Sequence, residues 1–335
     1  MYGSNALMTQ YVGLDLAIFS VTGADALPFL QSQLTQDVDH LKADNANPTP
    51  TSVLAGFCTA KGKLLADMVL APTATENHFL GMAKADVLPA FLKRLRMFVL
   101  RSKVTLEPVS LTASGIVIAA DTLNQAETAL GHPLPHAVWA TVIADDGVWV
   151  SAPSADNNIL RFWWLADTNQ SETLTNRLGQ DLTVVDNADD WSVMDLQAGL
   201  PWIEADTQDL LIPQTVNLDL IQGVSFTKGC YPGQEVVARA HYRGTVKRRM
   251  QLGHISTDDS GNVAIKPGED IFCPADGPNP CGRIISTARD ATRIWLLFEA
   301  PLKLTQAEPA ATLHVGAVDG PILEQQALPY SVVTS

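Results

Sequence analysis

The sequence predicts an α+β fold with largely antiparallel sheets and a small β-barrel at its C-terminal end. Strand-like and helix-like segments are mixed without the regular spacing of βαβ units, which argues against a doubly wound parallel sheet. After Gly244 the pattern changes to six short β-rich runs separated by Gly, Pro, Asp and Asn, which is typical of a small barrel. With 335 residues, 46% of them hydrophobic and 17% charged, the chain can form two or three domains with substantial cores.

The N-terminal half supplies the clearest elements. A strand is expected over 14–22, and Gly23 and Asp25 then open a helix with Leu27, Leu30 and Leu34 on one face. Segment 52–71 predicts two strands around a turn at Lys61–Gly62. A helix is expected over 85–98, with Asp86 as its cap and Pro89 in its first turn, where proline is tolerated.

The other elements follow in chain order. Further strands are predicted at 78–82, 100–106, 115–119, 147–152 and 159–165, and further helices at 121–130, 169–179, 191–197 and from Gln234 to a C-cap at Gly244. The barrel strands are predicted at 245–256, 269–273, 281–288, 292–298, 311–316 and 321–327.

The charge balance is acidic, with 22 Lys and Arg against 36 Asp and Glu residues and a net charge of −14. On average such a surface repels nucleic acid and anionic membrane. Ten of the 22 basic residues nevertheless lie in two windows, 93–103 and 239–249. The windows are either two solvated faces or a local anion site, and the sequence leaves both alternatives open.

Four cysteines, Cys58, Cys230, Cys273 and Cys281, are too few for a disulfide framework. The first residues lack the pattern of a signal peptide, and no apolar run approaches the roughly 18 residues of a membrane span. We therefore expect a cytoplasmic protein with reduced thiols and no membrane association. The pair Cys273 and Cys281 has no CxxC motif or His partner nearby, so we predict no metal site.

The strongest chemical signature is the segment FTKGCYPGQE, residues 226–235, which a helical run follows. Gly229 and Gly233 permit backbone angles that other residues avoid. Cys230 is expected in a turn that leads to the helix N-terminus, two residues after Lys228, and both the cation and the helix dipole favour the reactive thiolate. The alternative is a buried, inert cysteine beside a tight turn.

The helix after this segment carries its own charges. Glu235 and Arg239 are four residues apart, an ion-pair spacing, and Arg243 lies one turn further. His241 on the same helix is either an exposed surface histidine or a group that tunes the thiol. The sequence contains no nucleophile elbow, phosphate-binding loop or dinucleotide fingerprint.

The run KGCYPGQE resembles the signature of the YgfZ-type folate-binding proteins, relatives of the glycine-cleavage T-protein (aminomethyltransferase). Its residues here are Lys228, Gly229, Cys230, Tyr231, Pro232, Gly233, Gln234 and Glu235. Further blocks are similar to the same family, namely VTGADALPFLQSQLTQDV at 21–38, FCTAKGKLLADMVL at 57–70, RSKV at 101–104, AGLP at 198–201, the long stretch 212–244 and LPYS at 328–331. The resemblance covers nearly the whole chain.

The resemblance implies a GcvT/YgfZ-like fold, in which three subdomains form a ring around a central channel that binds tetrahydrofolate or another folate. It implies that residues 1–244 form the folate-binding region and residues 245–335 the C-terminal β-barrel domain. Within 1–244 we expect two interleaved subdomains, approximately 1–50 with 186–244, and 51–185.

The resemblance also implies a function. The family acts in the assembly, repair or maintenance of iron–sulfur enzymes, including the one that methylthiolates tRNA, and it is not known for a settled reaction of its own. We therefore expect a monomeric accessory factor in tRNA modification, with Cys230 as its functional thiol, Lys228 beside it, and folate and iron–sulfur enzymes as partners.

Four residues are candidates for contact with folate, because a pterin needs stacking and polar partners and its glutamate tail is anionic. Trp191 matches a family position associated with folate, and Gln197 stands where the family commonly has an acidic residue. The Gln197 amide can both donate to and accept from a pterin edge. Asp37 closes the first helix and is expected to face the channel. Arg243, with the other cations of windows 93–103 and 239–249, is expected to receive the tail.

Two other functions stay open at this point. One is a folate-dependent aminomethyltransferase or demethylase of the T-protein type, although such transferases typically lack the KGCY cysteine. The other is a non-enzymatic tRNA-binding module, for which the two basic windows permit weak contact and against which the net charge of −14 argues.

Overall fold

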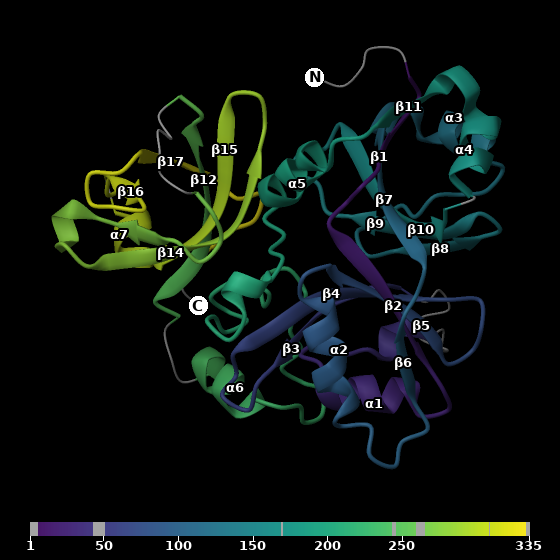
Figure 1. Cartoon of the computed structure of the whole chain (residues 1–335), viewed down its shortest axis with the longest axis horizontal. Helices are drawn as coiled ribbons and strands as arrows, with labels where there is room; N and C mark the ends of the chain where they lie inside the picture. The colour runs from purple at the N-terminus through teal and green to yellow at the C-terminus, as the bar shows by residue number, and fades with distance from the viewer. Residues whose placement is uncertain are drawn as a thin grey trace.

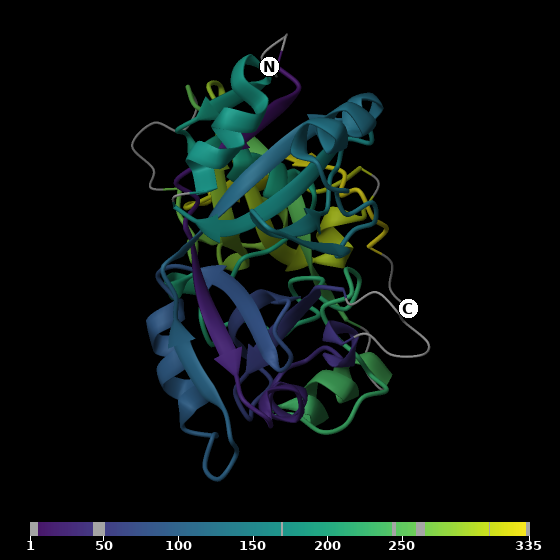
Figure 2. The ribbon, with the colours of Figure 1, turned by 90° about the vertical axis from the view of Figure 1, so that its right-hand side faces the viewer.

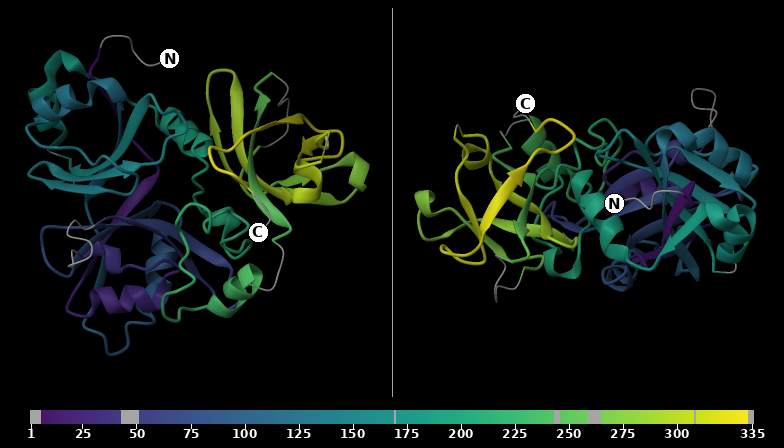
Figure 3. Two further views of the ribbon diagram at one scale, coloured as in Figure 1. Left: turned by 180° about the vertical axis from the view of Figure 1, so that it is seen from behind. Right: turned by 90° about the horizontal axis from the view of Figure 1, so that it is seen from above.

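The computed structural model describes residues 6–42, 51–168, 170–242, 246–258, 265–307 and 309–332. Its strands form a five-stranded sheet, a six-stranded sheet and a closed barrel. Figures 1 and 3 show the three units in a ring, with the barrel beside the two sheets. The α+β fold, the ring of three units and the C-terminal barrel are therefore confirmed. None of the described helices is both long and apolar enough to cross a membrane.

The five-stranded sheet has the strand order β3-β4-β5-β2-β6 and is antiparallel throughout. Its strands are β2 (Leu16–Thr22), β3 (Val53–Cys58), β4 (Leu64–Pro72), β5 (His78–Lys84) and β6 (Thr105–Pro108). Helices α1 (Ala26–Gln33) and α2 (Leu88–Arg96) bury Phe29, Leu30, Phe91 and Leu95 against one face of this sheet. Burying each such side chain contributes about 1.5–3 kcal/mol.

The six-stranded sheet has the order β11-β1-β7-β10-β9-β8, with β1 and β11 as its one parallel pair. Its strands are β1 (Met8–Tyr11), β7 (Leu111–Ala119), β8 (Thr141–Ala144), β9 (Gly147–Ala152), β10 (Ile159–Asp167) and β11 (Leu182–Val185). Helices α3 (Leu123–Leu130) and α4 (Gln170–Leu178) pack on the face that carries Trp149 and Trp164. The opposite face carries Trp163, against which Trp191 of α5 (Ala188–Gln197) packs edge to face.

The barrel closes in the order β12-β15-β14-β13-β16-β17. Its strands are β12 (Arg248–Ser256), β13 (Asp270–Phe272), β14 (Pro280–Arg289), β15 (Arg293–Pro301), β16 (Leu313–Val315) and β17 (Ile322–Gln326). Each of the six predicted β-rich runs overlaps one of these strands, and β14 and β15 extend beyond the predicted bounds. The barrel is joined to the rest of the chain by α6 (Gln234–Tyr242) and packs against α5 (Figure 1).

Short elements complete the fold. They are α7 (Leu302–Thr305) and the 3-10 turns η1 (Asp39–Leu41), η2 (Ala120–Thr122), η3 (Gly179–Asp181), η4 (Ala205–Thr207) and η5 (Pro274–Asp276).

Four features differ from the sequence predictions. The strand expected at 100–106 is displaced, since β6 covers Thr105–Pro108 and residues 100–104 form no strand. Strands β1, β8 and β11 were not predicted, because each has only four residues and little periodicity. Asp86 does not cap α2, since its carboxylate accepts the backbone N–H of Ala205 instead. Strand β2 shares a sheet with β3–β6, so the sheets do not follow the expected grouping of 1–50 with 186–244. The boundary near residue 244 stays a prediction.

Candidate functional site

The cysteine of the KGCYPGQE segment lies at the surface. Cys230 is exposed, whereas Cys58, Cys273 and Cys281 are buried. The alternative of a buried, inert Cys230 is therefore wrong. Burial raises the pKa of the Cys58 thiol to about 12 and, together with the proximity of Cys273, the pKa of Cys281 to about 11. Cys230 is thus the accessible thiol among the described residues.

Lys228 does not point into solvent beside the thiol. Its Nζ donates hydrogen bonds to the backbone oxygens of Leu34, at 2.8 Å, and Gln36, at 2.9 Å, just beyond the end of α1. Burial lowers the pKa of the Lys228 ammonium to about 8, against the opposing attraction of Asp37 and Asp39. Lys228 therefore ties the cysteine loop to the chain that follows α1.

The second glycine of the segment is required by packing. Gly233 has φ +82°, and a Cβ on it would lie 2.4 Å from the Thr59 oxygen and 2.7 Å from Cα of Gly62. The segment thus rests on the β3–β4 turn at Lys61–Gly62, which was predicted from the sequence. Gly229 differs, because its φ is outside the left-handed region and nothing lies within 4 Å of an added Cβ. The expectation that the glycine adopts backbone angles that other residues avoid is therefore confirmed for Gly233 and wrong for Gly229.

Helix α6 follows the cysteine loop as predicted. Its Arg239 pairs with Glu235 at 2.8 Å, and both side chains are exposed. The His241 ring stacks on Phe226 with centroids 3.7 Å apart, so this histidine is neither free at the surface nor held by a hydrogen bond to the thiol. Tyr231 is buried inside the loop, which raises its pKa. Arg243 and the expected C-cap Gly244 lie outside the described residues.

Two adjoining clefts have volumes of about 450 and about 280 Å³. Both are lined by Val138, Trp139 and Gln222. The larger cleft is also lined by Gln36, His40, Thr51, Ser52, Val53 and Leu54, and the smaller by Pro153, Ser154, Ala198, Leu200, Leu220, Ile221, Pro329 and Tyr330. These side chains come from β3, from the loops before β8 and after β9, from segments 198–200 and 220–222, and from the chain after the barrel. That the clefts form the expected central channel stays a prediction.

Two of the residues that line both clefts, and one that contacts a lining residue, have strained backbones. Trp139, Asn217 and Gln222 have φ values of +68°, +60° and +64°, which side-chain-bearing residues rarely adopt. Trp139 and Gln222 line both clefts, and the buried Asn217 donates to the Tyr330 hydroxyl at 3.4 Å. Residues held in sparsely populated conformations cluster at functional sites, because only the surrounding structure keeps them there.

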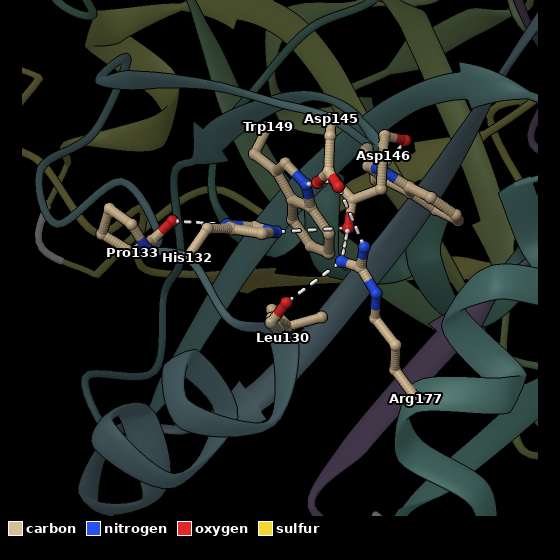
Figure 4. A network of polar contacts seen from close by, with 8 residues as sticks. Leu130, His132, Pro133, Asp145, Asp146, Trp149 and Arg177 are labelled. Atoms are coloured by element: carbon tan, nitrogen blue, oxygen red, sulfur yellow. Dashed lines mark hydrogen bonds and ion pairs between the residues drawn. The ribbon is translucent and has the colours of Figure 1, made fainter.

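A polar network joins the chain after α3 to the β8–β9 turn, to β9 and to α4 (Figure 4). The buried Asp146 carboxylate accepts from Arg177 at 3.0 Å, from Trp149 at 2.9 Å and from His132 Nε2 at 3.2 Å. His132 Nδ1 faces the Pro133 oxygen at 2.8 Å, so both ring nitrogens face acceptors. The hydrogen bond to Asp146 raises the pKa of His132, and the imidazolium form fits this geometry.

A direct link joins the cysteine loop to the larger cleft. Lys228 donates to the backbone oxygen of Gln36, and the Gln36 side chain lines the cleft and donates to the Gln222 oxygen. Gln222 lines both clefts. Gln36 and Lys228 thus connect the cleft wall to the loop that carries Cys230.

Three of the predicted folate residues, Trp191, Gln197 and Asp37, are not among the described residues that line the clefts. Trp191 is fully buried, with the Arg161 guanidinium 4.1 Å from its ring centroid, and it fixes α5 to the six-stranded sheet. Gln197 is half-buried at the end of α5, directly before the lining residue Ala198. Asp37 is half-buried, accepts from Gln31 at 2.9 Å and follows the lining residue Gln36. Their roles toward folate stay predictions.

The described cations of the two basic windows lie elsewhere. Arg249 is buried in a two-pronged contact with Asp219, and Arg248 binds Glu299 at 2.6 Å. Lys93 and Arg94 line a separate groove. None of the described residues that line the two clefts is Lys, Arg, Asp or Glu. The described cations of the windows therefore do not line the clefts, whereas Arg243 lies outside the described residues and its role toward a folate tail stays a prediction.

The sequence alone missed several lining residues. Trp139 and Ser52 carry no pattern that separates them from ordinary loop and strand residues. The blocks AGLP and LPYS and the stretch 212–244 did carry a signal, because Ala198, Leu200, Ile221 and Tyr330 all reach the smaller cleft. Among the described residues, no group of His, Cys, Asp or Glu is arranged to hold a metal ion.

The chain is similar to curated proteins along most of its length. It is 34% identical over 266 residues to the tRNA-modifying protein YgfZ of Yersinia enterocolitica, covering 77% of this chain and 73% of that protein. It is 34% identical over 253 residues to the protein of the same name from Yersinia pestis, covering 74% of this chain and 71% of that protein. No protein-family profile matches the chain.

A solved structure shares the fold. The glycine cleavage system aminomethyltransferase T from Bartonella henselae superposes with a TM-score of 0.70, covering 97% of this chain and 86% of that protein. The sequence identity is 15%, so this likeness concerns the fold.

Proposed function

The chain belongs to the YgfZ family of tRNA-modifying proteins, and from this membership we propose that it is a folate-binding accessory factor in tRNA modification that supports iron–sulfur enzymes. Cys230 is its functional thiol, and the two adjoining clefts hold the folate. The observation that carries the proposal is the hydrogen-bonded link from the larger cleft through Gln36 and Lys228 to the loop of Cys230.

The cleft residues fit the flat part of a folate. A pterin needs an aromatic or apolar wall and neutral groups that donate and accept hydrogen bonds, and binding sites for such ligands are mostly apolar with a few polar groups. Trp139, Leu54 and Tyr330 supply the wall, and Gln36, Ser52 and Gln222 supply the polar groups. When bound, tetrahydrofolate supplies a carrier for one-carbon units. The anionic tail would leave through the cleft mouth toward solvent.

The thiol is presented for contact with another protein. Cys230 is exposed, and Gly229 beside it leaves open space above the backbone. The other described cysteines are buried, so chemistry at a partner's surface is directed to this one thiol. Lys228 and Gly233 hold the loop from two sides, one against the chain after α1 and the other against the β3–β4 turn.

Folate binding is tested by titration with tetrahydrofolate while tryptophan fluorescence is followed. We expect saturable quenching in the wild type and in Trp295→Phe, whose indole lies in the barrel, and loss of the signal in Trp139→Phe. No binding at millimolar ligand contradicts the proposed ligand.

The link to the thiol is tested by the rate at which iodoacetamide alkylates Cys230. We expect tetrahydrofolate to change this rate in the wild type and not in Lys228→Met. Lys63→Met is the matched control, because Lys63 makes the same kind of bond, to the Leu210 oxygen at 2.6 Å, but takes no part in the link through Gln36. Equal responses in both variants argue against the link.

The role of the thiol itself is tested in cells. Cys230→Ala should fold normally, since Cys230 is exposed, and should fail to restore methylthio-tRNA formation in a strain that lacks the protein. Full restoration contradicts a functional thiol. The aminomethyltransferase alternative predicts folate-dependent ammonia release from an aminomethyl-lipoyl protein, which the accessory-factor proposal does not.

A further inference from the structure

The connection between α2 and β6 projects from the five-stranded unit at the lower edge of the ribbon in Figures 1 and 2. With the last turns of α2 it carries five exposed cations, Lys93, Arg94, Arg96, Arg101 and Lys103. It also carries three exposed apolar side chains, Met97, Phe98 and Leu100. We call residues 93–103 the tip surface.

The cations of the tip surface lack acidic partners. None of the five makes an ion pair with a described residue. Arg96 donates to the Leu106 oxygen, at 2.8 Å from Nε, and Asp25 accepts the backbone N–H of Lys103. The segment contains no Asp or Glu, although the whole chain has a net charge of −14. The tip surface is thus a positive area on an acidic protein.

Leu100 lies at a position where a leucine does not favour the folded state. Its side chain is 89% exposed and its φ is +38°, a conformation that glycine adopts without strain. Met97 is 70% exposed beside it. An exposed apolar side chain on a strained backbone does not stabilise the folded chain. We therefore infer that Leu100 contributes by contact with another molecule.

A groove adjoins the exposed side chains. Its volume is about 310 Å³, with Leu65, Phe91 and Met97 as apolar lining and Lys93 and Arg94 at its edge. An apolar anchor of a partner could enter it while carboxylates pair with the two cations. Buried anchors surrounded by Arg and Met contacts are typical of protein interfaces.

The chemistry favours protein over RNA. Bases stack on aromatic rings, and Phe98, the aromatic residue of the tip surface, is held edge to face against Phe57 at 6.4 Å. The most exposed apolar side chains of the tip surface are the aliphatic Leu100 and the thioether Met97, and neither offers an aromatic ring for a base. We propose that the tip surface docks an acidic, amphipathic segment of a partner protein, with Leu100 and the groove as its apolar anchor points. This docking is independent of folate and of Cys230.

The test uses the full chain and a designed probe, a fluorescent helical peptide of about 20 residues with Leu at every third or fourth position and Glu elsewhere. Its Lys counterpart is the charge control. We expect the Glu peptide alone to bind, and Leu100→Gly and Arg101→Glu each to raise the Kd about tenfold or more. Leu100→Gly should keep or raise the melting temperature, since glycine relieves the strain.

Ile322→Ser is the matched control, because Ile322 is also an exposed apolar residue but lies on the barrel. The Kd of this variant for the Glu peptide should equal that of the wild type. Four results overturn the proposal. They are no binding of the Glu peptide, equal binding of the Lys peptide, an unchanged Kd in Leu100→Gly, and unfolding of that variant. Displacement of the peptide by tRNA or by phosphatidylglycerol vesicles, at physiological salt, reassigns the surface to RNA or membrane and equally overturns it.

Discussion

Replacing Gly233 by alanine should destabilise the protein, whereas replacing Gly229 in the same segment should leave its stability unchanged. In Gly233→Ala the new Cβ would lie 2.4 Å from the Thr59 oxygen on a backbone with φ +82°. The left-handed conformation costs a residue other than glycine about 1–2 kcal/mol, and the crowding costs about 1–3 kcal/mol. Together the free energy of unfolding should fall by about 2–5 kcal/mol.

Gly229→Ala is the matched control within the same segment. Nothing lies within 4 Å of its added Cβ, so its stability should stay within about 0.5 kcal/mol of the wild type. Urea unfolding followed by far-UV circular dichroism measures both variants. Hydrogen exchange at the Gly62 amide, which donates to the Thr59 oxygen at 2.9 Å, reports the turn directly. Equal stabilities of the two variants would refute the packing of Gly233 on the β3–β4 turn.

Three further outcomes are expected. The raised pKa of His132 contributes stability that is full below about pH 6.5 and is lost as the pH rises through the folded pKa, so His132→Gln should destabilise more at pH 6 than at pH 9 in thermal melts. Arg161→Met should cost about 3–5 kcal/mol in urea unfolding, because it strips a buried partner from Asp195, whereas Lys303→Met at an exposed pair should cost below about 1 kcal/mol. No Lys or Arg lines the clefts among the described residues, so extra glutamates on the folate tail should find no cation there. Calorimetry should therefore give Kd values that differ by less than about threefold between a folate with one glutamate and a folate with three. An affinity at least about tenfold higher for the triglutamate would contradict this.

The local sequence was sufficient for most elements and for the segment of Cys230. Helix α2, the β3–β4 turn and all six barrel strands follow from apolar periodicity and turn residues, which are properties of neighbouring residues. The exposure of Cys230 was one of two alternatives, because a turn near a helix start is compatible with either a buried or an accessible thiol.

Tertiary structure decided which residues meet. The sequence indicated Lys228 as a cation for the thiol, yet its ammonium binds backbone oxygens 192 and 194 residues earlier in the chain. Trp191 was expected at the ligand and is in the core, whereas Trp139, which no pattern marked, lines both clefts. Sheet membership likewise depends on pairing between distant strands, as β2 with β5 shows.

The sequence by itself determined the element types, the barrel and the chemical identity of the cysteine segment, because each depends on residues close together along the chain. Only the tertiary structure decided where the clefts lie, which cations are already paired and which are free at the tip surface. Those properties depend on burial and on contacts between residues far apart in the chain. The type of a charged or aromatic residue does not determine whether its side chain is buried, paired or exposed.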